Sequence, residues 1–180
     1  MSKKKILILL ISINFICFNL STYDGICNIR NLRISLQTPT NPIYTSAMNT
    51  WNITFDANDI NDIQIDSSNN FIIVEGDSTS DFCFLIYNNN GTFLGKYTWN
   101  STGGTTRAHA CTIDSQNNII IVGTYEKKYD IHEDLFVVKF FQNGTVMWYT
   151  TWSNTHMSCD HGIDVVTDYS DNIYVVGNTY

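Results

Sequence analysis

One phrase occurs three times along this chain of 180 residues: DIQIDSSNNFIIVEG at 62–76, ACTIDSQNNIIIVGT at 110–124 and DVVTDYSDNIYVVGN at 164–178. Asp66, Asp114 and Asp168 hold the same place in each copy, at spacings of 48 and 54 residues. A self-similar period near 50 residues indicates a stack of structural units. The repeat therefore constrains the fold more than any single segment does.

Each unit reads as β structure, because runs of β-branched and aromatic residues alternate with turns rich in Asn, Asp, Ser and Gly. In the second unit we expect strands at 110–114, 118–123, 135–141 and 145–152, with a polar loop at 125–133. Apolar runs such as IIIVG and LFVVKFF favour sheets that are covered on both faces. The predicted fold is all-β: an incomplete β-propeller of four-stranded antiparallel blades. A β-sandwich would also have short strands but would not require this internal copy number.

The predicted blades occupy 62–99 and 110–152, a third runs from Gly162 to Tyr180, and Asn52–Phe55 resembles the outer strand of a preceding blade. This amounts to about two whole blades plus partial blades at each end, within a repeat region at 51–180 that follows a lead-in segment at 24–50. Propellers close with ~4–8 blades. We therefore expect a fragment of a longer protein, a truncated gene product or part of a ring of several copies. Truncation is the favoured interpretation, and open blade edges predict self-association.

Residues 1–23 read as an export signal. Lys3–Lys5 precede the apolar run Ile6–Leu20 and a polar exit, which is the order of a Sec-type leader. The run is shorter than the roughly 20 residues that span a bilayer comfortably. An uncleaved signal anchor is the alternative, because no clear small-x-small cleavage site is present. The sequence predicts a secreted or cell-surface protein, with a possible membrane tether.

Composition excludes some partners and favours an oxidising compartment. The formal net charge is −7, and no basic patch with interleaved aromatics is present, so nucleic-acid binding is not expected. Four cysteines follow the leader and allow three disulfide connectivities. Cys83 lies in an apolar run and is predicted to be a buried small hydrophobe. The other three are Cys27, Cys111 and Cys159.

The unit resembles the bacterial and archaeal β-propeller repeat known as the SBBP family, over roughly 51–180. The resemblance is carried by the N-I-Y-V-x-G strand at Asn172–Gly177, the F-V-x-K run at Phe136–Lys139 behind Asp134, the Asn143–Gly144 turn and the W-x-x-x-W motif at 148–152. It implies a propeller on an exported or surface protein. It carries no catalytic signature.

Function is expected on one side of the blades. Turns between the first and second strands and between the third and fourth are short and generic, whereas the segments at 100–109, 125–133 and 153–161 are longer and individual. Variable loops on a rigid scaffold commonly carry binding residues. The candidate binding residues on this side are His109, Tyr125, His132, His156, Asp160 and His161.

Other chemical motifs have simpler explanations. The H-M-S-C-D-H cluster at 156–161 matches no standard zinc or copper spacing, so no metal or other cofactor is predicted. The repeated Asp66, Asp114 and Asp168 are predicted to cap turns rather than to bind calcium. Core packing is the preferred interpretation of the tryptophans, with sugar stacking the alternative. Those residues are Trp51, Trp99, Trp148 and Trp152, and the possible glycan acceptors are Asn52, Asn90, Asn100 and Asn143.

The sequence thus predicts an exported, non-enzymatic repeat module for binding, adhesion or scaffolding, with a protein or glycan partner. No nucleophile elbow, Walker loop, HExxH or paired-carboxylate pattern is present. Two alternatives stay open. The chain could be a fragment of a propeller-based enzyme acting on polysaccharide, or a truncated product without independent function.

Overall fold

The computed structural model describes residues 60–76, 81–99, 103–128, 132–154 and 159–180. These ranges contain strands and turns, and no helix in them is long and apolar enough to cross a membrane. The predicted leader, the lead-in segment, Trp51 and Asn52–Phe55 lie outside the described residues. The strands are β1 (Ile60–Ile65), β2 (Phe71–Glu75), β3 (Cys83–Tyr87), β4 (Phe93–Thr98), β5 (Gly104–Ile113), β6 (Ile119–Lys127), β7 (Glu133–Phe140), β8 (Val146–Trp152), β9 (Asp160–Thr167) and β10 (Ile173–Thr179).

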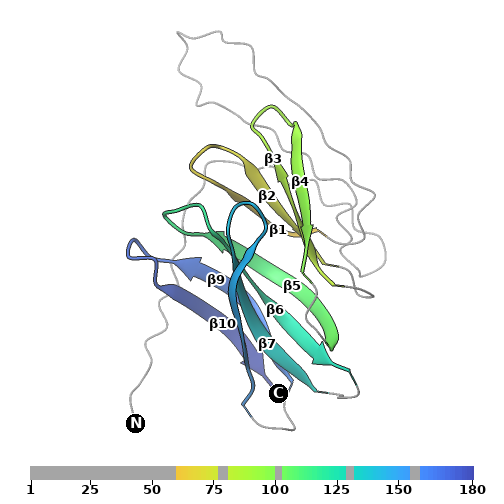
Figure 1. Ribbon diagram of the computed structural model, residues 1–180. Coiled ribbons are helices and arrows are strands. Elements are labelled where there is room, and N and C mark those ends of the chain that lie inside the picture. The colour runs from red at the N-terminus through yellow and green to blue at the C-terminus, as the bar shows by residue number, and fades with distance from the viewer. Residues whose placement is uncertain (1–59, 77–80, 100–102, 129–131, 155–158) are drawn as a thin grey trace, which may run out of the picture.

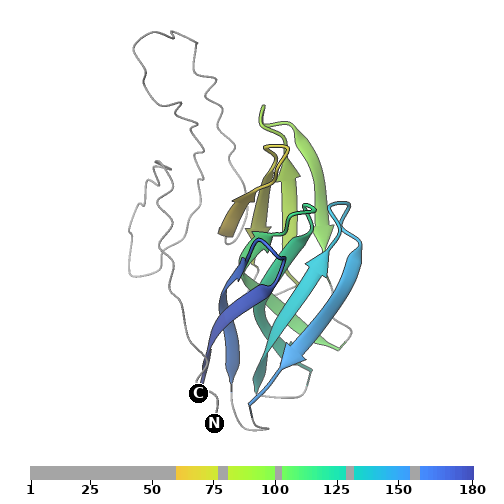
Figure 2. The same ribbon diagram turned by 90° about the vertical axis from the view of Figure 1, so that its left-hand side faces the viewer.

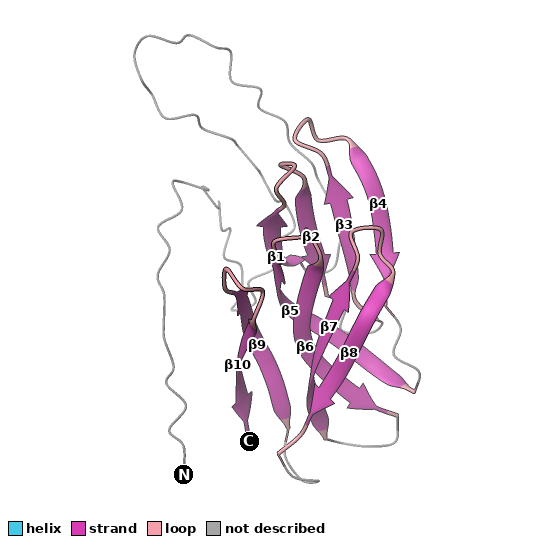
Figure 3. Ribbon diagram, turned by 60° about the vertical axis from the view of Figure 1, so that its left-hand side comes forward, coloured by secondary structure: helices cyan, strands magenta, loops and turns pink. Residues whose placement is uncertain are grey.

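The strands form three antiparallel sheets in chain order. The first sheet is β1-β2-β3-β4, the second is β5-β6-β7-β8, and the third contains β9 and β10. Figures 1, 2 and 3 show them as stacked layers, with the second sheet between the other two. The all-β class and the four-stranded antiparallel sheets are confirmed. None of the sheets closes on itself.

The repeated aspartates shape the turn that follows the first strand of each sheet. Asp114 Oδ1 accepts the backbone N–H groups of Gln116 and Asn118 at 2.9 and 2.8 Å, and Oδ2 accepts the side-chain amide of Asn118 at 2.8 Å. Asn117 adopts a positive φ of 62°, which Asn tolerates better than most residues. The same bonds recur around Asp66 and Asp168. The predicted capping role of the three aspartates is confirmed.

The first strands are longer than the sequence predicts. β5 begins at Gly104 rather than 110, and β6 continues to Lys127, because Gly104 pairs with Lys127 across the ladder. His109 and His161 therefore lie in strands β5 and β9, not in loops as predicted. The physical reason is that pairing with the second strand resumes beyond a β-bulge, which hydrophobic pattern alone does not reveal.

In the second and third units a bulge and a glycine face each other, and in the first unit Glu75 takes the place of the glycine. The pairing shifts register around Asn61 in β1, around His109 in β5 and around Ile163 in β9. Opposite the bulge of the second unit, a Cβ on Gly123 would collide with the carbonyl oxygen of Arg107. Gly177 meets the carbonyl of His161 in the same way. The repeated glycine is thus needed for close approach of two backbones.

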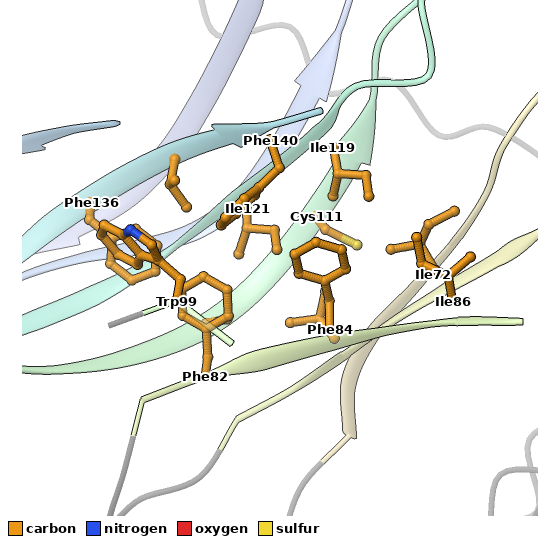
Figure 4. Packing of buried hydrophobic residues seen from close by; sticks show 13 residues of the cluster. Ile72, Phe82, Phe84, Ile86, Trp99, Cys111, Ile119, Ile121, Phe136 and Phe140 are labelled. Atoms are coloured by element: carbon orange, nitrogen blue, oxygen red, sulfur yellow. The ribbon is translucent and has the colours of Figure 1, made fainter. Parts of the chain in front are cut away.

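The first and second sheets share the largest apolar core. Ile72, Val74, Phe84 and Ile86 on one side meet side chains of β5, β6 and β7 on the other (Figure 4). Aromatic rings dominate near the start of β3: Phe82 stacks on Phe136 with ring centroids 5.5 Å apart. Burial of such rings stabilises the contact strongly. The facing residues of the second sheet are Ala108, Cys111, Ile119, Ile121, Phe136, Val138 and Phe140.

The second and third sheets meet through a separate cluster. Ile120 and Val122 point away from the first sheet and pack, with Ala110 and Val137, against Val165 of β9. Adjacent residues of β6 therefore serve opposite interfaces, as the alternation of side chains along a strand requires. The first strands approach one another closely, β1 with β5 and β5 with β9, whereas β4 and β8 make no comparable approach.

Candidate functional site

The stacked sheets have two chemically different ends. The turn end carries the turns that join β1 to β2, β3 to β4, β5 to β6, β7 to β8 and β9 to β10. At the opposite end, here called the link end, β6 finishes and β5, β7 and β9 begin. The sequence placed the candidate site at the link end.

Side chains at the turn end are used to join neighbouring units. Asn117 Oδ1 accepts the backbone N–H of Ser67 at 3.0 Å, and its Nδ2 donates to Ser67 Oγ at 2.7 Å. Asp171, the equivalent residue of the third unit, accepts the backbone N–H and the hydroxyl of Ser115 at 2.8 and 2.7 Å. These repeated bonds explain the polar turns structurally, without a ligand.

His109 also joins two units. Its Nδ1 lies 2.7 Å from the carbonyl oxygen of Gly162. Because a carbonyl can only accept, Nδ1 carries the proton in this contact, and Nε2 is the acceptor of the neutral ring. Asn61 stands at the same bulge position in the first unit and donates to the carbonyl of Ala108. His109 is therefore a connecting residue between β5 and β9.

A charged network crosses the link end from the second sheet to β9. Glu133 is its centre: Oε1 accepts from Arg107 at 2.5 Å, and Oε2 lies 2.6 Å from His161 Nε2. Arg107 also donates to Glu126 at 2.9 Å. The His161 contact is ionic when the ring is protonated, although its direction does not meet the requirements of a hydrogen bond. The histidine ring also lies near that of Tyr180, with centroids 5.6 Å apart.

The network is partly open to solvent. The side chains of Arg107, Glu133 and His161 are 32%, 21% and 30% exposed. A half-exposed ion pair with fixed geometry can present donors and acceptors to a polar partner. We call Arg107, Glu126, Glu133 and His161 the link-end network.

The structure brings together only part of the predicted set. His109 and His161 are neighbours, with ring centroids 6.4 Å apart. Asp160 is adjacent in sequence but fully buried, and its Oδ2 accepts the backbone N–H of Asn154 at 2.9 Å. Tyr125 packs against the core between the first and second sheets, on the opposite face from His109's contact with the third. His132 immediately precedes Glu133, and His156 lies outside the described residues.

Sequence reasoning did not select Arg107, Glu126 or Glu133. None of the three belongs to a motif, and their separation of up to 26 residues hides the contact. The available signal was the scarcity of charge, 15% of the chain, which makes three charged residues near the predicted link segments unusual.

Two segments have residues that could bind an ion and are predicted not to do so: 156–161, which lies partly outside the described residues, and the turn at Asp168. Within the described residues, no group of three or more His, Cys, Asp and Glu side chains is placed to hold a metal ion. Asp168 is engaged instead by its turn: hydrogen bonds from the Asn172 side chain and from the backbone lower its pKa to about 2. Asp171 accepts from Ser115, as described above.

The described cysteines form no disulfide with one another. Cys83 and Cys111 are buried and free, and Cys159 is half-buried and free. Burial, together with a hydrogen bond to Glu75, raises the pKa of the Cys83 thiol to about 11. Burial also raises the pKa of Cys111 well above its usual value. The prediction that Cys83 is a buried hydrophobe is confirmed, and Cys27 lies outside the described residues.

The tryptophans divide into two groups. Trp99 is 7% exposed and packs on Phe136 and Tyr149 of the following unit, so its predicted core role is confirmed. Trp148 and Trp152 are 39% and 52% exposed, and the same prediction is wrong for them. Trp152 is equivalent to Trp99 in the repeat. The rings of the following unit that cover Trp99 come from β7 and β8, and the third sheet as described contains only the first two strands of a unit.

Comparison with known families found no family model that matches the chain, and comparison with curated proteins found no match to it.

Proposed function

We propose that this chain is part of an exported β-propeller-type repeat module, similar to the SBBP repeat, which binds a protein or glycan partner without catalysing a reaction. The radial arrangement is supported by the close approach of β1 to β5 and of β5 to β9, which β4 and β8 do not share. Sheets that converge on their first strands have the wedge shape that propeller blades require. The leader-like residues 1–23 support export.

The link-end network is the observation that carries the binding proposal. Its charged side chains converge from β5, β6, β7 and β9, and they are partly exposed. The turn end differs, because its side chains at equivalent positions repeat the same bonds between units. Polar groups that no repeated bond explains are the stronger candidates for recognition. The mixed charge of the network suits a polar surface, such as a glycan or a hydrophilic protein loop.

The binding proposal is tested with a panel of immobilised oligosaccharides and extracellular proteins. We expect saturable binding to at least one member and no turnover of it. Glu133→Gln should weaken that binding at least tenfold, because it removes the negative charge at the centre of the network. Ser115→Ala, at the turn end, is the matched control and should bind as the wild type does.

If Glu133→Gln does not change the binding, the link-end network is not the binding site. Product release from a polysaccharide on the panel would instead support the enzymatic alternative. Export is tested separately by expressing the full chain and comparing it with a variant in which Lys3–Lys5 are replaced by Glu. The variant should accumulate inside the cell.

A further inference from the structure

A directional rule governs the contacts between units. In the first unit, Ile72 and Val74 of β2 face the second sheet, and Asp62 of β1 faces it as well. In the second unit, the equivalent residues of β6, Ile120 and Val122, face the third sheet. Side chains at these positions of a unit thus always face the unit that follows. We call this surface of a unit its forward face.

Within the described residues, the forward face of the third unit is largely exposed. Tyr174 and Val176 of β10 are the equivalents of Ile72 and Val74, and they are 55% and 49% exposed. Val166 on β9, which pairs with Tyr174, is 54% exposed. In the first two units the equivalents on the second strand are at most 1% exposed. An apolar sheet face of this kind marks an interaction surface.

Polar groups on the same face match the repeated interface. Asp62 Oδ1 accepts the N–H of Ile63, and Oδ2 accepts the N–H of Cys111 in the following unit at 2.8 Å. Asp164 is the equivalent of Asp62, and its Oδ1 accepts the N–H of Val165 at 2.8 Å. Its Oδ2 is therefore placed to accept a backbone N–H from a unit that docks in the same way.

The turn supplies a second match. The backbone N–H of Ser67 donates to Asn117, and that of Ser115 donates to Asp171. Each acceptor lies in the turn of the following unit, three residues after its repeated aspartate. Tyr169 is the equivalent of Ser67 and Ser115 in the third unit, and its side chain is fully exposed. One position departs from the pattern: the bulge residue is Ile163, which cannot donate as Asn61 and His109 do.

We propose that the forward face of the third unit, formed by Asp164, Val166, Tyr174 and Val176, is a docking surface for a further unit of the same repeat. The incoming unit would present apolar side chains in the places of Cys111, Ile119 and Ile121, and Asn or Asp in the place of Asn117. This chain's own first unit is not the occupant, because Phe71 and Ile73, its equivalents of Ile119 and Ile121, are already buried. The inference rests on the repeat architecture of the proposed function, not on the link-end site.

The test extends the full chain by its own repeat. Gly177 is equivalent to Gly123, so residues 124–180 are fused directly after Gly177. The fusion adds the third and fourth strands to the third unit and then supplies the first two strands of a following unit. Pairing with the added third strand protects β10 by itself, so the reference is the shorter fusion described next, which adds only the two missing strands. Hydrogen exchange measured by mass spectrometry should be at least about tenfold slower in β10 of the long fusion than in β10 of that shorter fusion. The added copy of β10 should exchange as β10 does in the parent.

Two controls make the result specific. Tyr174→Lys with Val176→Lys should leave the parent folded, since both side chains are about half exposed and only the hydrogen bond from Tyr174 to Asp168 is lost, but should abolish the difference in β10 exchange between the two fusions. A shorter fusion that ends at the copy of residue 154 adds only the two missing strands. It should bury Trp152 and leave Tyr174 exposed to solvent, and it serves if the long fusion does not fold.

Equal exchange of β10 in the folded long fusion and in the shorter fusion would overturn the proposal. Concentration-dependent dimerisation of the parent, measured by light scattering and lost in the double lysine variant, would also overturn it, because the occupant would then be a second copy. Binding to the oligosaccharide and protein panel is measured in parallel. If β10 is protected in the long fusion but no panel member binds in a way that depends on Glu133, the proposed binding function is contradicted and the docking surface is not.

Discussion

Strands β6 and β10 have nearly the same sequence pattern and very different surroundings. Ile120 and Val122 in β6 are completely buried, whereas Tyr174 and Val176 at the equivalent places of β10 are about half exposed. β6 lies between two strands of its own sheet and between two sheets, whereas β10, among the described strands, pairs with β9 alone. Burial in this molecule is therefore a property of the neighbours that a unit has, and not of the unit itself, as in other repeat architectures.

The same comparison explains the two tryptophans at the ends of β4 and β8. Trp99 is covered by Phe136 and Tyr149 from the following unit, whereas Trp152 is 52% exposed. An exposed aromatic in a repeat is thus not evidence of a sugar-binding platform by itself. It can mark the place where a neighbouring unit would pack.

The largest expected difference concerns the buried and the exposed member of one repeat position. Ile120→Ala should lower the free energy of unfolding by about 2–5 kcal/mol, because it leaves a cavity between the second and third sheets. Tyr174→Ala should lower it by less than about 1 kcal/mol. Urea denaturation followed by circular dichroism measures both. Equal losses would contradict the assignment of Ile120 as buried and of Tyr174 as exposed.

An intermediate difference is expected at the turn aspartates. Asp114 is buried and pairs with Lys139 at 2.7 Å, whereas Asp168 is only half-buried. Asp114→Asn should cost about 1–3 kcal/mol near neutral pH, because it leaves the Lys139 ammonium without its partner. Asp168→Asn should cost less.

The dependence on pH distinguishes the two aspartates further. Burial would raise the pKa of Asp114, but hydrogen bonds from Lys139 and Asn118 outweigh it and hold the pKa below its usual value. Its contribution is therefore complete above the unfolded pKa of about 3.9 and is lost as the pH falls through the folded pKa. The difference in free energy of unfolding between wild type and Asp114→Asn should become smaller as the pH falls from 6 to 3. The stabilising contribution of Asp168 should be lost gradually as the pH falls to about 2, the pKa of this carboxyl in the folded protein. A stability difference that grows on acidification would show that folding raises the pKa of Asp114 rather than lowering it.

The smallest expected difference is at the turn end. Ser115→Ala removes the hydroxyl that donates to Asp171 and should cost about 0.5–1 kcal/mol. Tyr169→Ala, at the equivalent position of the third unit, should leave stability unchanged within about 0.5 kcal/mol. Thermal melts of the two variants beside wild type are sufficient to compare them. A larger loss for Tyr169→Ala would show that this side chain has a stabilising contact.

Turn chemistry and strand content were predictable because they depend on local sequence. An Asp at the end of a strand, followed four residues later by Asn, is enough to define the hydrogen-bonded turn at Asp66, Asp114 and Asp168. The Asn-Gly pairs likewise predict the hairpins at Gly91 and Gly144, both with φ of +79°. These elements need no information from distant parts of the chain.

The candidate site was only partly predictable, since its contacts join segments far apart in the chain. His109 and His161 were selected as loop residues, but strand pairing extends over both, and the bulge directs His109 to the carbonyl of Gly162. Glu133 meets Arg107 and His161 only once β7, β5 and β9 are packed together. No local pattern encodes that meeting.

The sequence by itself determined the unit: its period, the approximate positions of its strands and its capped turns. Only the tertiary structure decided which copy of each residue is buried, which charges meet at the link end and which sheet face is left uncovered. The physical reason is that hydrogen bonds within a turn involve residues close in the chain, whereas burial and ion pairing depend on which neighbour is packed alongside.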